Sequence, residues 1–160
     1  MRNVDFLSVV VPCHNEEEVL PSTHQALVRV LTQAFSRKLL QRYEVLYVNN
    51  GSTDKTAQVL DGLFIQDAHV RVIELRRNFG YQGSISAGLA FAQGDAVVTI
   101  DADLQDPPEK IIDMLEFYAQ GYDLVARPLS ATAAPRRRRQ SVNPPVEAPR
   151  SIAVRPATSS

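Results

Sequence analysis

The chain has 160 residues, enough for one domain, and its 17 Lys and Arg nearly balance 18 Asp and Glu, giving a formal net charge of −1. A single cysteine, Cys13, excludes an internal disulfide and fits a reducing compartment. No stretch reaches the roughly 18 consecutive apolar residues of a membrane-spanning helix, and the N-terminus lacks the long apolar region of a signal peptide. The composition therefore predicts a cytoplasmic domain with no transmembrane segment.

The composition changes near residue 126. All six Phe and five Tyr precede Asp123, whereas the residues from Arg127 onward hold 7 Arg, one acid, 6 of the 10 Pro and none of the 7 Gly. That segment carries +6, which leaves −7 on the rest of a chain whose net charge is −1. We expect residues 1–126 to fold and residues 127–160 to form a disordered Arg/Pro-rich tail. The acidic body argues against nucleic acid as a partner, and Arg136–Arg139 is typical of a solvated basic run.

Short apolar runs alternate with helical patterns along the body of the chain. Runs such as Leu7–Val11 are typical of strands buried on both faces, and the segments between them have the period of helices. In chain order the sequence predicts a strand at Leu7–Val11, a helix over residues 17–35, a strand at Glu44–Val48, a helix over residues 55–66, a strand at Val70–Leu75, a helix over residues 82–93, a strand at Ala96–Ile100, a helix over residues 108–120 and a fifth strand at Asp123–Ala126. This alternation predicts an α/β fold with a mostly parallel sheet and helices on both faces.

Local signals refine these elements. Glu16–Glu18 lie near the predicted start of the first helix, where the helix dipole favours acids. The chemistry of Asn49–Ser52 predicts a turn, and Ser52 or Thr53 is expected to cap the next helix. Cys13 follows the first strand and is interpreted as a small packing residue rather than a nucleophile, because no histidine partner is evident.

Polar side chains follow each of the first four predicted strands. They are His14, Asn15 and Glu16, then Asn49–Ser52, then Arg76–Asn78, and finally Asp101, Asp103 and Gln105. The carboxyl ends of parallel strands meet at one edge of a sheet, and ligands of open α/β sheets bind at that edge. Neither the G-x-G-x-x-G dinucleotide motif nor the P-loop motif is present, so the common phosphate-binding loops are excluded.

Two aspartates, Asp101 and Asp103, end the Ala96–Ile100 run. Alternate strand residues share a face, so both carboxylates are expected on one side. Hard oxygen ligands of this kind suit Mg²⁺ or Mn²⁺, especially when phosphates complete the coordination shell. The alternative is a surface turn rich in Asp, but the four polar clusters at one edge favour a site.

Four ordered segments together resemble the GT-A glycosyltransferases of family 2, most closely the polyprenyl-phosphate sugar transferases. The segments are SVVVPCHNEEEVL, VNNGSTDKT, LRRNFGYQGSISAGLAFAQGD and DADLQDPPEKI, and the likeness covers about residues 5–126. The resemblance implies a GT-A Rossmann-like fold. Family members continue for roughly another hundred residues beyond this point, so we expect the domain to be incomplete at the C-terminus and the isolated chain to transfer sugar at a rate near background.

The resemblance also implies the chemistry and the site. It implies inverting, metal-assisted transfer of a sugar from a nucleotide-sugar donor, UDP-linked by expectation, to a polyprenyl-phosphate acceptor. By position, it assigns nucleotide binding to Pro12, His14, Glu16, Asn50 and Asp101, metal binding to Asp101, Asp103 and Gln105, catalysis to Asp101 and Asp103, and the phosphate or acceptor side to Arg77. A surface cation with no role in binding is the alternative for Arg77. The implied location is peripheral, at the inner face of the membrane, with a membrane-protein partner, while the oligomeric state stays open.

One departure from the family concerns the second motif. Asn49 and Asn50 stand where the family has an acidic pair. A neutral amide at position 50 accepts a hydrogen bond from a base without charge assistance, so donor binding is expected to be weaker than with an aspartate. Two other functions stay open: a nucleotide-binding fragment without turnover, and a sugar transferase that acts on a soluble or polysaccharide acceptor.

Overall fold

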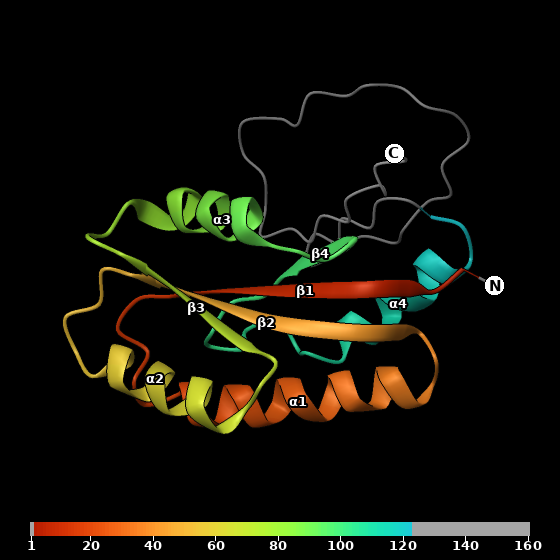
Figure 1. Ribbon diagram of the computed structural model, residues 1–160, viewed down its shortest axis with the longest axis horizontal. Helices are drawn as coiled ribbons and strands as arrows, with labels where there is room; N and C mark the ends of the chain where they lie inside the picture. The colour runs from red at the N-terminus through yellow and green to blue at the C-terminus, as the bar shows by residue number, and fades with distance from the viewer. Residues whose placement is uncertain (1, 123–160) are drawn as a thin grey trace.

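Four parallel strands form the sheet in the computed structural model, which describes residues 2–122 (Figure 1). The elements in chain order are β1 (Val4–Cys13), α1 (Leu20–Ser36), β2 (Leu40–Asn50), α2 (Thr56–Gln66), β3 (Val70–Leu75), α3 (Gly80–Phe91), β4 (Ala96–Thr99) and α4 (Lys110–Ala119). The sheet order is β3-β2-β1-β4, and each neighbouring pair is parallel. The predicted α/β architecture is confirmed.

The order of the strands places a crevice beside β1. The chain moves outward from β1 to β2 and β3, and then crosses back so that β4 pairs with the other side of β1. Val9 of β1 lies in register with Val45 of β2 and with Val98 of β4. Such a reversal of direction is where ligands bind in open α/β sheets, just beyond the carboxyl ends of the strands. The predicted site residues follow those ends.

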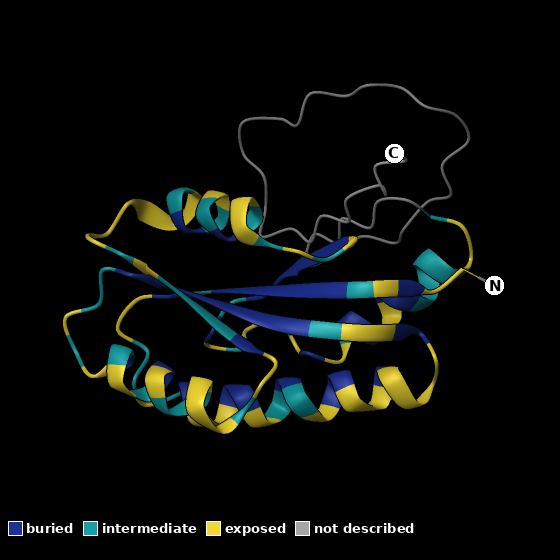
Figure 2. Ribbon diagram, viewed as in Figure 1, coloured by how far each residue is buried: buried dark blue, intermediate teal, exposed yellow. Residues whose placement is uncertain are grey.

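Helices cover both faces of the sheet, with α3 on one face and α1, α2 and α4 on the other (Figure 1). Because strand side chains alternate, Val9 and Val11 pack into the cluster that includes α1 and α4, whereas Val10 packs toward α3. Small residues bring α3 close: a Cβ on Gly88 would lie 2.3 Å from Cγ1 of Val10. The buried strand residues of Figure 2 therefore form two apolar layers that fix the strand ends in space.

Several element boundaries differ from those predicted. Asn49 and Asn50 are the last residues of β2; Asn49 pairs with β1 and β3, and Asn50 pairs with β3, so the turn begins at Gly51, whose φ is +63°. The prediction of a turn at Asn49 was wrong because strand pairing on both sides overrides the turn preference of asparagine. Glu16–Glu18 lie in the loop before α1, which begins at Leu20, so its first turn holds no acid.

The predicted cap of α2 was also wrong. Neither Ser52 nor Thr53 caps the helix; Oδ1 of Asp54 instead accepts hydrogen bonds from the backbone N–H of Thr56 at 2.9 Å and from its hydroxyl at 2.5 Å. These bonds lower the pKa of Asp54 against the effect of desolvation. Ser52 and Thr53 bond to Asn15 instead, so the turn chemistry connects two loops rather than starting a helix.

The fifth strand predicted at Asp123–Ala126 and the tail predicted at residues 127–160 lie outside the described residues. Among residues 2–122, no helix combines the length and apolar character needed to cross a membrane. Cys13 is 1% exposed, its thiol donates to the carbonyl of Val11 at 3.5 Å, and burial raises its pKa. These observations agree with its interpretation as a packing residue.

Candidate functional site

A cavity of about 280 Å³ lies beyond the carboxyl ends of β1, β2 and β4, beside the start of α3. It is lined by Pro12, Cys13, His14, Glu16, Asn50, Asn78, Gly80, Tyr81, Ser84, Asp101, Ala102 and Asp103. Six of the eight predicted site residues are in this set. Gln105 and Arg77 are not, although each follows the same strand ends. The fold thus gathers residues from distant parts of the chain around one small cavity.

Asn50 holds one wall of this cavity in place. Its side-chain oxygen accepts the backbone N–H of Phe79 at 2.9 Å, and its amide nitrogen donates to Oδ1 of Asn78 and to the carbonyl of Gly80, both at 3.1 Å. Oδ1 of Asn78 also accepts the N–H of Gly80 at 2.8 Å. The buried amide of Asn50 therefore bonds three successive residues of the β3–α3 loop, a role that the sequence did not indicate.

Gly51 brings the same loop within contact of the β2–α2 turn. A Cβ on this residue would lie 2.4 Å from both the carbonyl carbon of Arg77 and the backbone nitrogen of Asn78. With its φ of +63°, the position requires glycine for two separate reasons. The end of β2 and the β3–α3 loop therefore form one packed unit at the cavity.

His14 and Asn15 connect the β1–α1 loop to this unit. Nδ1 of His14 donates to the carbonyl oxygen of Asn50 at 2.8 Å, which assigns the acceptor role to Nε2 in the neutral ring. Asn15 adopts a left-handed backbone with φ of 54°, and its side-chain oxygen accepts the N–H of Thr53 at 2.8 Å. Its own N–H donates to the hydroxyl of Ser52 at 3.0 Å. Sequence reasoning placed Asn15 in the polar cluster but gave it no role.

Carboxylates crowd the opposite wall of the cavity. Burial raises the pKa of the Glu16 carboxyl, and the nearby charge of Asp103 raises it further. Asp54 and Asp101 add to this increase, while His14 offsets part of it. The acids therefore repel one another at neutral pH, and a cation between them would relieve that repulsion.

Hydrogen bonds to the backbone fix the segment after β4 that carries Asp101 and Asp103. The hydroxyl of Thr23 in α1 donates to the carbonyl of Ala102 at 2.6 Å, and Oδ1 of Asp103 accepts the N–H of Gln105 at 3.2 Å. Leu104 has a φ of 53°, and its N–H bonds the carbonyl of Asp101 at 3.2 Å. The strand geometry predicted from the D-x-D spacing ends at Thr99, so a turn positions both carboxylates.

The donor set fits a cation that shares its coordination with a diphosphate. Among residues 2–122, no three His, Cys, Asp or Glu side chains lie close enough to hold a metal ion on their own. Mg²⁺ sites commonly use one or two carboxylates plus substrate phosphates, and Mn²⁺ also favours oxygen ligands. Burial and the nearby charges of Asp103, Asp54 and Asp101 all raise the pKa of Glu16, so a cation close to Asp101 and Asp103 would reduce the local negative charge.

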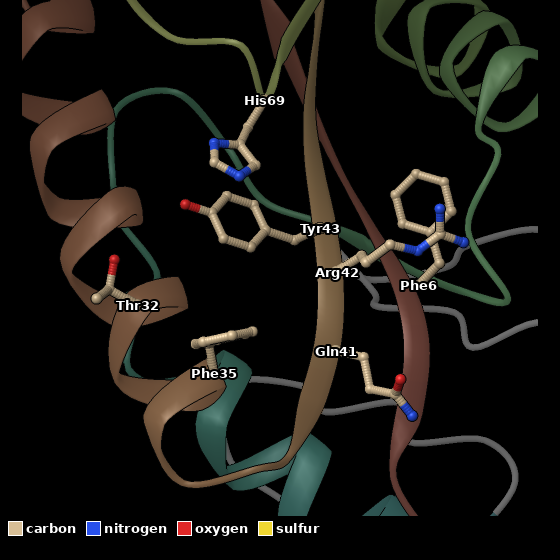
Figure 3. A pocket seen from close by; sticks show the side chains of 7 residues that line it. All are labelled: Phe6, Thr32, Phe35, Gln41, Arg42, Tyr43 and His69. Carbon is tan, nitrogen blue, oxygen red and sulfur yellow. The ribbon is translucent and has the colours of Figure 1, made fainter.

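A larger cavity, of about 470 Å³, lies near the amino-terminal parts of β1 and β2 (Figure 3). It is lined by Phe6, Thr32, Phe35, Gln41, Arg42, Tyr43 and His69. The rings of Tyr43 and His69 stack at 4.2 Å, and the Arg42 guanidinium lies 4.6 Å from the centre of the Phe6 ring. This lining holds no carboxylate and none of the predicted site residues. The smaller cavity at the opposite ends of the strands is therefore the candidate active site.

The fold and this acidic cavity match the class of the GT-A glycosyltransferases, and comparison with known proteins identifies the family. The family model "Glycosyl transferase family 2" matches residues 8–150. The chain therefore belongs to glycosyl transferase family 2. This match extends past residue 126, where the likeness was expected to stop.

Curated relatives share substantial identity over part of their length. An uncharacterized glycosyltransferase, YkcC of Bacillus subtilis, is 46% identical over 124 residues, which cover 78% of this chain and 36% of the relative. The undecaprenyl-phosphate 4-deoxy-4-formamido-L-arabinose transferase of Proteus mirabilis is 43% identical over 125 residues, which cover 78% of this chain and 37% of the relative. The chain thus spans little more than a third of the length of these relatives.

Solved structures share the fold at lower identity. A mannosyltransferase from Pyrobaculum calidifontis, in complex with GDP-Man and Mn²⁺, has a TM-score of 0.59 at 23% identity, covering 78% of this chain and 35% of that one. Residues 1–349 of TarS from S. aureus, in complex with UDP-GlcNAc, have a TM-score of 0.55 at 22% identity. The match covers 81% of this chain and 37% of the TarS chain. These likenesses show the GT-A fold alone.

Proposed function

We propose that the cavity binds the nucleoside diphosphate part of a nucleotide-sugar donor, and that the protein transfers the sugar to a polyprenyl phosphate. The single observation that carries the proposal is the convergence of Asp101, Asp103 and Glu16 with the ends of β1 and β2 at the crevice beside β1. The Proteus mirabilis relative is an undecaprenyl-phosphate sugar transferase by name, which supports the lipid-phosphate acceptor. The nucleotide complexes of the structural neighbours support a nucleotide donor.

The proposed chemistry is an inverting displacement at the anomeric carbon. An oxygen of the acceptor phosphate forms the new bond, and the nucleoside diphosphate leaves with the bonding electron pair. That phosphate is anionic near neutral pH, so no strong general base is required, and the rate depends on positioning and on charge stabilisation. In this proposal Pro12, His14 and Asn50 form the nucleoside end of the cavity, and Arg77 lies on its acceptor side.

Asp101 and Asp103 would hold Mg²⁺ or Mn²⁺, with Gln105 close by. The bound cation supplies charge stabilisation for the leaving diphosphate. Glu16 completes the acidic wall, and its raised pKa reflects the same local charge. This arrangement predicts that diphosphate binding depends on the cation, whereas binding of a nucleoside without phosphates does not.

Calorimetry with UDP and GDP, each with and without Mn²⁺, tests the binding step. The variant Asp103→Ala should lose the increase in UDP affinity that Mn²⁺ gives the parent chain. Asp61→Ala is a matched control, because Asp61 is exposed on α2 and lies outside the cavity lining. The assignment of the metal site would be refuted if Asp103→Ala kept the same Mn²⁺ dependence as the parent.

The acceptor is tested separately with a radiolabelled sugar donor. Transfer to an organic-soluble product with polyprenyl phosphate supports the lipid acceptor, and a product that stays in water supports a soluble acceptor. Donor binding with neither product would leave a nucleotide-binding fragment. This last outcome would agree with the near-background transfer expected of the isolated chain and would leave the donor site intact, whereas robust turnover would refute that expectation.

A further inference from the structure

The loop between β3 and α3 presents a cationic and aromatic surface at the rim of the cavity. Phe79 is 49% exposed and Tyr81 is 41% exposed, and both follow the exposed pair Arg76 and Arg77. The Arg77 guanidinium lies 4.5 Å from the centre of the Phe79 ring. Tyr81 also lines the cavity. We call these four residues the rim surface; Figure 2 shows the loop and the start of α3 as exposed.

The charge of the rim surface is opposite to that of the body around it. Residues 1–126 carry a net charge of −7, whereas the rim surface carries two arginines and no acid. Within the described residues, neither guanidinium forms an ion pair, although Arg29, Arg37 and Arg71 each pair with a glutamate. Two arginines that pair with no carboxylate of residues 2–122 lie beside two half-exposed rings. This combination favours an anionic partner with an apolar layer beneath its charges.

We propose that the rim surface docks on an anionic lipid surface and so holds the cavity mouth beside the headgroups. Aromatic rings of this kind settle at the boundary between headgroups and acyl chains, and each arginine near an anionic surface adds attraction. Docking rests on the proposed function in one respect, because it takes the cavity to be the site that binds the sugar donor. It adds the surface by which a chain with no spanning helix among its described residues meets a lipid acceptor.

The packing beneath the loop makes this surface rigid. The Asn50 side chain bonds Phe79, Asn78 and Gly80, and Gly51 packs against the backbone of Arg77. The loop therefore loses little conformational entropy on docking, unlike a mobile segment of the same composition. Arg76, Arg77 and Phe79 are exposed on this loop, while Tyr81 also lines the cavity.

The chain contains no tryptophan, so a single introduced tryptophan reports its own surroundings. The variant Phe79→Trp should show a blue-shifted emission with vesicles that contain equal parts phosphatidylcholine and phosphatidylglycerol, and no shift with phosphatidylcholine alone. Phe64→Trp is the matched control, because Phe64 is 57% exposed on α2 and should show no shift. A shift at both positions, or at neither, would overturn the proposal.

A second experiment removes charge from the rim surface of the full chain. Arg76→Gln with Arg77→Gln should weaken partition onto the anionic vesicles by roughly thirtyfold at low salt, from two arginines at the surface. Arg136→Gln with Arg137→Gln removes the same charge from the basic run and should weaken partition less. Equal losses would show that net charge alone drives binding, which contradicts a docking surface.

Two readouts separate this proposal from neighbouring ones. Inorganic phosphate should leave the emission of Phe79→Trp unchanged, and a blue shift with phosphate alone would assign the arginines to an anion site instead. Calorimetry with UDP measures the donor site in the same variant. UDP binding without a vesicle-dependent shift would overturn docking and leave the proposed function, whereas a shift in a chain that binds no nucleotide would overturn the proposed function alone.

Discussion

The side-chain oxygen of Asn50 accepts the backbone N–H of Phe79 at 2.9 Å, joining the end of β2 to the loop that forms one wall of the cavity. The same amide donates to Asn78 and Gly80, so both kinds of hydrogen-bonding group on Asn50 are used within the protein. Resemblance to the family predicted that Asn50 faces the nucleobase. That assignment stays a prediction; the hydrogen bonds add a positioning role, because they fix the loop that forms the cavity wall.

This relationship reverses the expected effect of an aspartate at position 50. Asn50→Asp removes both N–H donors and places a carboxylate against two acceptor oxygens, Oδ1 of Asn78 and the carbonyl of Gly80. We expect weaker UDP binding and a loss of roughly 1–3 kcal/mol of unfolding free energy. Calorimetry and denaturant unfolding measure the two effects, with the exposed Asn3→Asp as an isosteric control. Tighter UDP binding by Asn50→Asp would instead support a direct hydrogen bond between residue 50 and the nucleobase.

Gly51 offers a test of the same wall from the backbone side. Gly51→Ala places a Cβ 2.4 Å from backbone atoms of Arg77 and Asn78 at a φ of +63°, so the loop must move. We expect a destabilisation of about 1–3 kcal/mol together with weaker UDP binding. Gly62→Ala is the matched control, since a Cβ there meets nothing within 4 Å and should stabilise α2 by about 0.5–1 kcal/mol. Equal effects of the two substitutions in denaturant unfolding would contradict the close packing.

The sequence predicted the sheet and most of the cavity because strand ends in a parallel sheet follow directly from apolar runs. Asp101 and Asp103 were located this way, because they directly follow the fourth apolar run. The role of Asn50 was not predictable, because it depends on the distance between two loops that are far apart in sequence. The φ of Asn15 and the cap at Asp54 were missed for a related reason: several Ser, Thr, Asn and Asp residues competed locally, and tertiary contacts chose among them.

A buried ionic network near the amino ends of the strands gives a pH-dependent prediction. Glu44 is 4% exposed and accepts hydrogen bonds from Arg71, from the N–H of Gln93 and from the hydroxyl of Ser8. Burial alone would raise the pKa of Glu44, but these bonds outweigh it and hold the pKa below its ordinary value of 4.5. The stabilisation is therefore present above that value and is lost as the pH falls through the lower folded-state pKa.

Glu44→Gln should accordingly lower the free energy of unfolding at neutral pH, by roughly 1–3 kcal/mol. The difference from the parent should shrink as the pH falls below the ordinary glutamate value. Urea unfolding across this range measures it. Glu109→Gln serves as the control, because its ion pair with Arg29 is exposed on both sides and should contribute little at any pH. A difference that stays constant with pH would show that packing, not charge, gives Glu44 its effect.

Glu16 should behave in the opposite sense, because its pKa is raised by burial and by the charge of Asp103. A raised carboxyl pKa means that ionisation of Glu16 opposes folding, so the cost is present at neutral pH and disappears once acid protonates the group in both states. Glu16→Gln should therefore raise the thermal midpoint at neutral pH, leave it nearly unchanged in acid, and weaken the Mn²⁺-dependent part of UDP binding. The change Glu17→Gln, one residue along the same loop, is the control, and thermal scans at both pH values with calorimetry measure the effects. A lower midpoint at neutral pH would mean that Glu16 makes stabilising contacts stronger than the repulsion, and the acidic wall would then be a structural feature rather than a cation site.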